Sequence, residues 1–267
     1  MNIYLYIIIF TMGTLFGSFY TLAVYRIPKN LDITRTHSFC PNCNHKLGFF
    51  ELIPVWSYIF LGAKCKECKQ KIRPRYFILE ILSGLTFVLI AYGLKIDAYN
   101  LEINKLIEFS HLVLYLVSIF IIAGIDKEYR EIEKKVLYYS ILVSCTYIIY
   151  LCIMDETSIY RYVMYLITLI ILLSIDSVEQ LKQAKESYIL ECLMLIVTMI
   201  ANTGELVTLA SCLIVFLAIA ILKIALYIKN ALNKSKKENV NINKAYHFGY
   251  LFCISNVIFL ILSFYIK

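Results

Sequence analysis

Long apolar stretches are the feature of this sequence that most restricts its possible folds. The chain has 267 residues, of which 60% are hydrophobic and 17% are charged, and its apolar runs are continuous rather than alternating. A run of about 20 apolar residues can cross a bilayer as an α-helix, because all its backbone hydrogen bonds are made within the segment. The sequence therefore predicts an all-α integral membrane protein with about eight transmembrane helices. The expected segments are 3–25, 76–94, 107–125, 136–153, 160–175, 187–201, 205–228 and 247–266.

Basic residues are unevenly distributed between the two sides that these segments define. Of the 26 lysines and arginines, the loops on one side carry ten, four, two and five. These loops are 26–75, 126–135, 176–186 and 229–246. The loops and ends on the other side carry only Lys95, Lys105, Arg161 and Lys267. Because cytoplasmic loops are enriched in Lys and Arg, we expect both termini outside and the long loop 26–75 in the cytoplasm.

The first apolar segment is expected to remain as a membrane anchor. No basic residue precedes it, as one would in a cleavable signal peptide, and Arg26 and Lys29 follow it. The net charge of +7 reflects mainly the orientation bias, with some attraction to anionic membrane lipid. Nucleic acid is not an expected partner.

Two C-x2-C pairs stand in the long loop after the first segment. They are Cys40-Pro-Asn-Cys43 and Cys65-Lys-Glu-Cys68, with 21 residues between them. Each pair can form a tight knuckle, and four thiolates can surround one ion as a tetrahedron, so the spacing predicts a zinc site. Disulfides are rare in the cytoplasm, which favours metal binding over a redox pair. The expected organisation is a first helix over 1–28, a zinc-binding subdomain over 29–75 and a polytopic membrane domain over 76–267.

The other five cysteines lie inside predicted segments, where we expect them to act as small apolar packing residues. They are Cys145, Cys152, Cys192, Cys212 and Cys253. Small residues at positions 13, 17 and 18 would let the first helix approach a neighbour closely. Glu80, one turn into the second segment, needs a partner there, and Arg73 or Arg75 is within reach. Trp56 with Tyr58 is a candidate lipid-interface anchor.

Several short motifs around the cysteines occur in one order. They are Gly17-Ser18-Phe19, Val24-Tyr25-Arg26-Ile27-Pro28, Ser38-Phe39-Cys40-Pro41-Asn42-Cys43, His45-Lys46-Leu47, Glu51-Leu52-Ile53-Pro54-Val55-Trp56-Ser57-Tyr58, Cys65-Lys66-Glu67-Cys68, Ile72-Arg73-Pro74-Arg75-Tyr76 and Glu80. In this order, over residues 17 to about 87, the sequence resembles the N-terminal region of the bacterial prepilin peptidases. The resemblance implies an aspartyl endopeptidase of the inner or plasma membrane that removes the leader of type IV prepilins or type II secretion pseudopilins. It also implies N-methylation of the new N-terminus with S-adenosylmethionine.

Asp126 is the candidate for the first catalytic carboxylate. Peptide cleavage by carboxylates requires two of them sharing a proton, near a helix end that water can reach. Asp126 lies at the cytoplasmic end of the third segment. It could equally do no more than end that helix. The resemblance implies the catalytic role, although the proline that usually closes this turn is replaced by Glu133.

The second catalytic carboxylate has no clear counterpart, because the Gly-x-Gly-Asp motif that the resemblance implies is absent from this sequence. Glu191 is the best candidate, since an intramembrane carboxylate is a functional-site hypothesis by default. Glu186, at the mouth of the sixth segment, is second, while Asp176 and Glu179 are expected to be solvated surface charges. His247, at the start of the last segment, is expected to be an interfacial polar residue that could also touch this site.

Glu191 is an imperfect substitute for the missing aspartate. Glutamate is the longer side chain, and Tyr188 and Leu190 stand in place of the motif's glycines, so we expect impaired or altered proteolysis. The alternative is a proteolytically inactive family member that acts as a methyltransferase or as a membrane assembly factor for pilus or secretion machinery. A transporter or channel with a zinc-binding loop is disfavoured, because the segments contain few polar residues and no repeat of broken helices.

Overall fold

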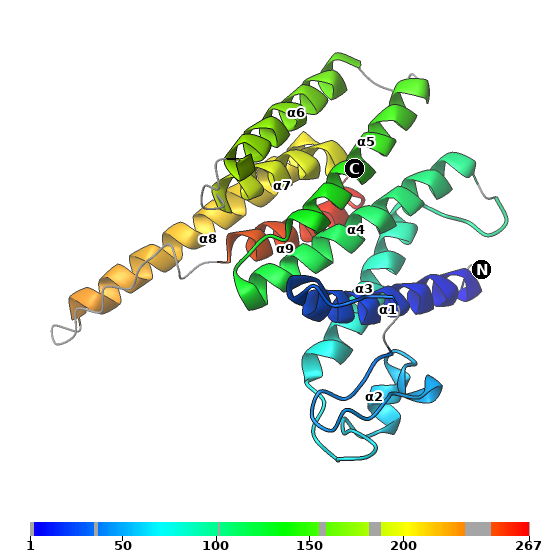
Figure 1. Cartoon of the computed structure of the whole chain (residues 1–267). Helices are drawn as coiled ribbons and strands as arrows, with labels where there is room; N and C mark the ends of the chain where they lie inside the picture. Colours follow the sequence, from blue (N-terminus) through cyan, green and yellow to red (C-terminus); the bar gives the residue numbers. More distant parts are fainter. Residues whose placement is uncertain are drawn as a thin grey trace. The chain divides into compact units, whose positions relative to one another are not determined.

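The computed structural model describes residues 3–34, 37–100, 102–154, 159–181, 188–232 and 247–266. Within these ranges the regular structure is helical, apart from two isolated β-bridges (Figure 1). The long helices are α1 (Ile3–Arg26), α3 (Pro74–Gly93), α4 (Ile103–Tyr129), α5 (Lys134–Met154), α6 (Ile159–Leu181), α7 (Tyr188–Thr203), α8 (Glu205–Leu232) and α9 (Phe248–Ser263). Between α1 and α3 lie the short helices η1 (Ile27–Lys29), η2 (Phe49–Glu51) and α2 (Trp56–Phe60).

The helices have the length and composition of membrane spans. Five of them, α1, α3, α4, α5 and α6, are long and apolar enough to cross a bilayer. Three more apolar helices are shorter, namely α7, residues Glu205–Ile221 of α8, and α9. The expected all-α, multi-pass membrane fold is therefore confirmed, and the four paired cysteines follow its first helix.

The chain divides into two compact units, 1–124 and 125–266, and the boundary lies within α4. In the first unit, α1 packs closely against α3 because glycines replace side chains where the two backbones meet. A Cβ atom on Gly13 would lie 2.8 Å from the Gly84 Cα, and one on Gly17 would lie 2.7 Å from the Glu80 Cα. The predicted close approach through small residues is confirmed. Tyr20 of α1 stacks on Phe120 of α4, with ring centroids 5.2 Å apart.

In the second unit, α7 contacts α5, α6, α8 and α9, and Figure 1 shows it among these helices. Buried amides join the helices. Asn202 of α7 donates to the Ser144 hydroxyl of α5 at 2.7 Å, and Asn256 of α9 donates to the Thr203 hydroxyl of α7 at 3.2 Å. Such interhelical hydrogen bonds between polar side chains commonly hold membrane helices together.

The glycine contacts between α1 and α3 predict the effect of a single added methyl group. In Gly17→Ala the new Cβ would meet backbone, which cannot rotate away, so α1 and α3 must separate. We expect a loss of about 1–3 kcal/mol of stability, the usual range for overpacking. Thermal unfolding of the detergent-solubilised protein measures this loss. Gly48→Ala is the matched control, because its Cβ would meet only the Glu51 side chain at 3.4 Å; equal melting temperatures for both variants would contradict the packing argument.

Candidate functional site

The loop between α1 and α3 contains two knuckles with the same backbone structure. In the first, the Cys40 amide donates to the His45 carbonyl and the Asn44 amide donates to the Cys40 carbonyl, both at 2.9 Å. In the second, Cys65 donates to Gln70 at 2.9 Å and Lys69 donates to Cys65 at 3.1 Å. Asn44 and Lys69 both have a φ of 56°. The pattern thus recurs with an offset of 25 residues between equivalent positions.

The isolated bridges extend this repeat, since Phe39 pairs with Lys46 and Lys64 pairs with Lys71. Each knuckle therefore turns its two thiols in the same direction relative to its own backbone. The loop geometry arises locally from the left-handed residue that follows each second cysteine.

The four thiols gather in one place, as the sequence predicted. The sulfur atoms of Cys40, Cys43, Cys65 and Cys68 all lie within 4.8 Å of one another. The Cys40–Cys68 and Cys43–Cys65 sulfur pairs are each 3.9 Å apart. Zinc–sulfur bonds of about 2.3 Å in a tetrahedron separate the sulfurs by about 3.8 Å. Two of the sulfur pairs therefore already have the separation that a zinc tetrahedron requires, and the cluster fits a zinc ion.

The surroundings of Cys68 favour the thiolate form that metals bind. The Asn42 side-chain amide lies 3.5 Å from the Cys68 sulfur as a hydrogen-bond donor. This contact, together with the Gln70 backbone amide, lowers the pKa of Cys68 to about 6.

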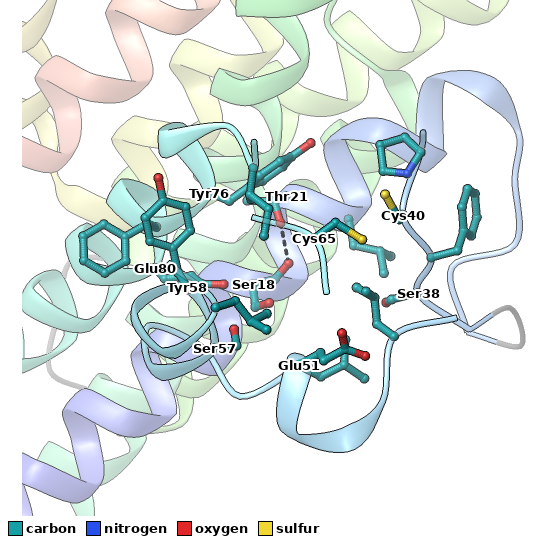
Figure 2. A pocket seen from close by; sticks show the side chains of 18 of the residues that line it. Ser18, Thr21, Ser38, Cys40, Glu51, Ser57, Tyr58, Cys65, Tyr76 and Glu80 are labelled. Carbon is teal, nitrogen blue, oxygen red and sulfur yellow. Dashed lines mark hydrogen bonds between the residues drawn. The ribbon is translucent and has the colours of Figure 1, made fainter. Parts of the chain in front are cut away.

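A pocket of about 280 Å³ lies between the knuckles and the adjoining ends of α1 and α3. Figure 2 shows Cys40 and Cys65 on one side of it and Tyr58 and Glu80 on the other. Its aromatic wall includes Tyr58 and Phe77, whose stacked rings have centroids 4.8 Å apart. The pocket therefore combines apolar surface with a few polar groups, which is typical of ligand sites.

Glu80 lies at this pocket with partners other than the expected arginines. Its Oε2 atom accepts a hydrogen bond of 2.7 Å from the Val55 amide, and Ser18 of α1 also bonds to the carboxylate. The predicted ion pair with Arg73 or Arg75 is therefore wrong. The physical reason is that the close α1–α3 packing brings Ser18 to Glu80, and the turn at Val55 presents an amide.

The turn at Val55 is strained. Val55 has a φ of 65° and a ψ of −55°, and the Trp56 amide donates to the Pro54 carbonyl at 2.7 Å, which closes a γ-turn. Left-handed backbone is costly for a β-branched residue, and such turns persist only where their surroundings impose them. The Val55 amide of this turn is the group that donates to Glu80.

In the second unit, Asp126 is fully buried and both oxygens of its carboxylate are bonded. Tyr188 donates its hydroxyl to Oδ1 at 2.8 Å, and the Tyr250 amide donates to Oδ2 at 2.8 Å. The Gly249 amide donates to the Tyr188 hydroxyl at 3.1 Å. A Cβ atom on Gly249 would lie 3.3 Å from Asp126 Cγ, so glycine gives the carboxylate room at this close approach. Asp126 thus caps the N-terminus of α9.

His247 contacts this site directly, since its Nδ1 atom lies 2.7 Å from the Asp126 carbonyl oxygen. The expectation that His247 could touch the site is confirmed. Glu191, in the first turn of α7, is buried, with 4% of its surface exposed. Among the described residues, the side-chain bonds of Asp126 join it to Tyr188 and Tyr250 and not to Glu191, so the pairing of the two carboxylates stays a prediction. Glu186 falls outside the described residues.

Asp176 was predicted to be a solvated surface charge, and that prediction is wrong. Its side chain is buried, with 2% of the residue exposed. It accepts hydrogen bonds from Tyr138 at 2.8 Å and from Lys134 at 3.0 Å. These donors on α5 are four residues apart and therefore on one helix face, which is the sequence signal that could have indicated the pairing.

Comparison with known proteins agrees with the geometry of the first unit. Residues 11–94, which contain most of α1, both knuckles and α3, match the family described as "Bacterial Peptidase A24 N-terminal domain". This N-terminal part of the chain is similar to the prepilin leader peptidase/N-methyltransferase family.

Among proteins named "Prepilin leader peptidase/N-methyltransferase", that of Vibrio cholerae is 33% identical over 130 residues, which cover 45% of this chain and 48% of the relative. That of Bacillus subtilis is 30% identical over 132 residues, covering 49% of each chain. That of Myxococcus xanthus is 38% identical over 81 residues, covering 30% of this chain and 24% of the relative. The chain thus matches half or less of the length of these relatives. No solved structure matches it significantly.

The cysteine cluster predicts the metal content of the purified protein. We expect about one zinc ion per chain, because four thiolates complete one tetrahedron. Replacing Cys40 and Cys65 by Ser removes one ligand from each knuckle and should abolish zinc binding, as measured by elemental analysis. Cys145→Ser with Cys152→Ser, in α5, is the matched control and should keep its zinc. Unchanged zinc in the Cys40 and Cys65 variant would exclude this cluster as the site.

The hydrogen bonds of Tyr188 predict a structural penalty for removing one oxygen atom. Tyr188→Phe leaves Asp126 Oδ1 and the Gly249 amide without their shared partner, which should cost about 1–3 kcal/mol of stability. Thermal unfolding in detergent measures the loss. Tyr162→Phe, on α6, is the control, because the Tyr162 contact is made by its ring, against Tyr165. A Tyr188→Phe protein as stable as this control would show that the network contributes nothing.

Proposed function

We propose that this protein N-methylates the free N-terminus of pilin-like proteins at the cytoplasmic face of the bacterial plasma membrane. The observation that carries the proposal is the pocket beside the cysteine cluster, whose lining residues all fall between Ser18 and Glu80, inside the part that matches the family. The relatives are named for two activities, and this part of the chain lies within the stretch that matches the family. The proposal assigns the N-methyltransferase activity to it.

The orientation follows from the distribution of basic residues, which puts the loop 26–75 in the cytoplasm. A pilin precursor is a basic leader followed by an apolar helix, so its junction lies at the same membrane surface. S-adenosylmethionine would supply the methyl group as a sulfonium. The nitrogen of the acceptor would lose a proton as it gains the methyl group, and a carboxylate of this chain can accept that proton.

The environment of Asp126 argues against leader cleavage by the same protein. An aspartyl protease holds its water between two carboxylates that share a proton. Here the Tyr188 hydroxyl and the Tyr250 amide bond the two oxygens of Asp126, and the residue is fully buried. Tyr188 stands where the family motif has its first glycine. Its side chain therefore fills the approach to Asp126 that the motif would leave open.

Leader cleavage through Asp126 and Glu191 is the second candidate function. It is favoured by one observation, namely that both carboxylates are buried. For cleavage, Tyr188 would have to leave Asp126 when a substrate strand enters. The substrates would then be type IV prepilins or type II secretion pseudopilins.

One experiment separates the two candidates. Zinc-loaded protein in detergent is given S-adenosylmethionine with either a leader-bearing pilin precursor or the same pilin with its N-terminus already free, and both products are analysed by mass spectrometry. We expect methylation of the free N-terminus by the wild type and, at about the same rate, by Asp126→Asn, because Asp126 has no part in that reaction. We expect no cleavage of the precursor.

Three outcomes would contradict this expectation. Cleavage by the wild type that is lost in Asp126→Asn would establish the peptidase instead. Methylation that survives replacement of Cys40 and Cys65 by Ser would show that the knuckles are not needed. If the protein neither methylates nor cleaves these substrates, both enzymatic functions are excluded for them. That outcome would favour an assembly role.

A further inference from the structure

The charged side chains at the pocket beside the cysteines favour a cationic ligand. Two of the lining residues, Glu51 and Glu80, are acidic, and one, Arg26, is basic. The buried Arg26 guanidinium donates to the backbone carbonyls of Asp32 at 2.9 Å and His37 at 3.1 Å. These bonds tie the segment after α1 back to the helix end. The carboxylates are therefore the charged groups that a ligand meets.

Glu51 has an oxygen atom that still needs a donor. Its Oε2 atom accepts hydrogen bonds from the Gly48 amide at 2.7 Å and from His45 Nε2 at 3.1 Å. Its Oε1 atom is buried and has no hydrogen-bond partner, although only 11% of the side chain is exposed. A buried acceptor without a partner is costly, so such an atom in the wall of a cavity indicates a missing donor.

The charge state of Glu51 is suited to binding a cationic ligand. The Gly48 amide, assisted by His45, lowers the pKa of the Glu51 carboxyl, so that the group is ionised at neutral pH. Glu80, 9% exposed, has its place fixed by Val55 and Ser18. Each carboxylate can accept about four hydrogen bonds, so both retain acceptor capacity for an ammonium group.

The size and the walls of the pocket restrict the rest of the ligand, beyond its cationic group. A volume of about 280 Å³ is at the lower end of the range for ligand sites, roughly 300–1,000 Å³. It suits one amino-acid residue rather than a nucleoside cofactor. The stacked pair Tyr58–Phe77 and the neighbouring leucines, Leu22 and Leu52 among them, favour an aromatic or aliphatic side chain. Aromatic faces also attract a nearby cation.

We propose that this pocket binds the N-terminal residue of a polypeptide, with the α-ammonium group at Glu51 and Glu80 and an aromatic or large aliphatic side chain against Tyr58 and Phe77. The pocket is thus the acceptor subsite, and the methyl donor binds elsewhere. The inference rests on the proposed function, which requires a bound N-terminal amine. Amine binding is measured without any methyl donor, so the acceptor subsite and the proposed function can fail separately.

The test uses full-length, zinc-loaded protein in detergent and two small probes. Phenylalaninamide carries an ammonium group and an aromatic side chain, and N-acetylphenylalaninamide has the same side chain without the charge. Isothermal titration calorimetry gives both affinities. Trp56 is the one tryptophan of the sequence and adjoins the lining residue Ser57, so its fluorescence reports binding at this pocket. We expect phenylalaninamide to bind at least about tenfold more tightly, because a charge-assisted hydrogen bond distinguishes the probes.

Variants of the two carboxylates locate the amine. Glu80→Gln and Glu51→Gln should each weaken phenylalaninamide binding by about tenfold while leaving the affinity for the acetylated probe nearly unchanged. Glu67→Gln is the matched control, since it removes an exposed carboxylate of the same loop that does not line the pocket. Zinc content and melting temperature confirm that each variant is folded.

Two results would overturn the inference: equal affinity for the two probes, or phenylalaninamide binding that neither Glu80→Gln nor Glu51→Gln weakens. Tight amine binding without methylation of any pilin would leave the acceptor subsite in place and refute the proposed reaction. Methylation by protein that binds neither probe would support the proposed reaction and refute the acceptor subsite.

Discussion

The backbone contact between α1 and α3 is the constraint on which the N-terminal unit depends. Gly13, Gly17 and Gly84 remove the side chains that would hold the two helices apart. This approach brings Ser18 to Glu80, and Glu80 in turn bonds the Val55 amide at 2.7 Å. The geometry of the extramembrane loop, including its strained turn, is therefore set from within the helix pair.

Much of this unit could be predicted from the sequence, because its determinants are local. The spacing of Cys40, Cys43, Cys65 and Cys68 predicted a tetrahedral cluster, and glycines one helical turn apart predicted close packing. Length and apolar composition were enough for the membrane helices. The partner of Glu80 could not be predicted in the same way. Sequence proximity suggested an arginine, whereas the observed partners come from α1 and from the turn at Val55.

The second unit was harder to predict, since its polar contacts join residues far apart in the chain. Asp176 looks like a loop residue in sequence, but it is buried against Tyr138 and Lys134 of α5. The bond from Tyr188 to Asp126 spans 62 residues. The absence of a Gly-x-Gly-Asp motif from the sequence predicted an irregular carboxylate site, and this stays a prediction. Tertiary packing then determines that a phenol lies against Asp126.

The repeated knuckles have a consequence for the biology of the metal. Each knuckle supplies two of the four sulfurs, and residues from both, Cys40 and Cys65 among them, line the pocket. Neither half can hold zinc tetrahedrally alone, so the metal couples the ordering of two segments 25 positions apart. Loss of any one of the four sulfur ligands would therefore be felt in both segments, and not only in the knuckle that carries it.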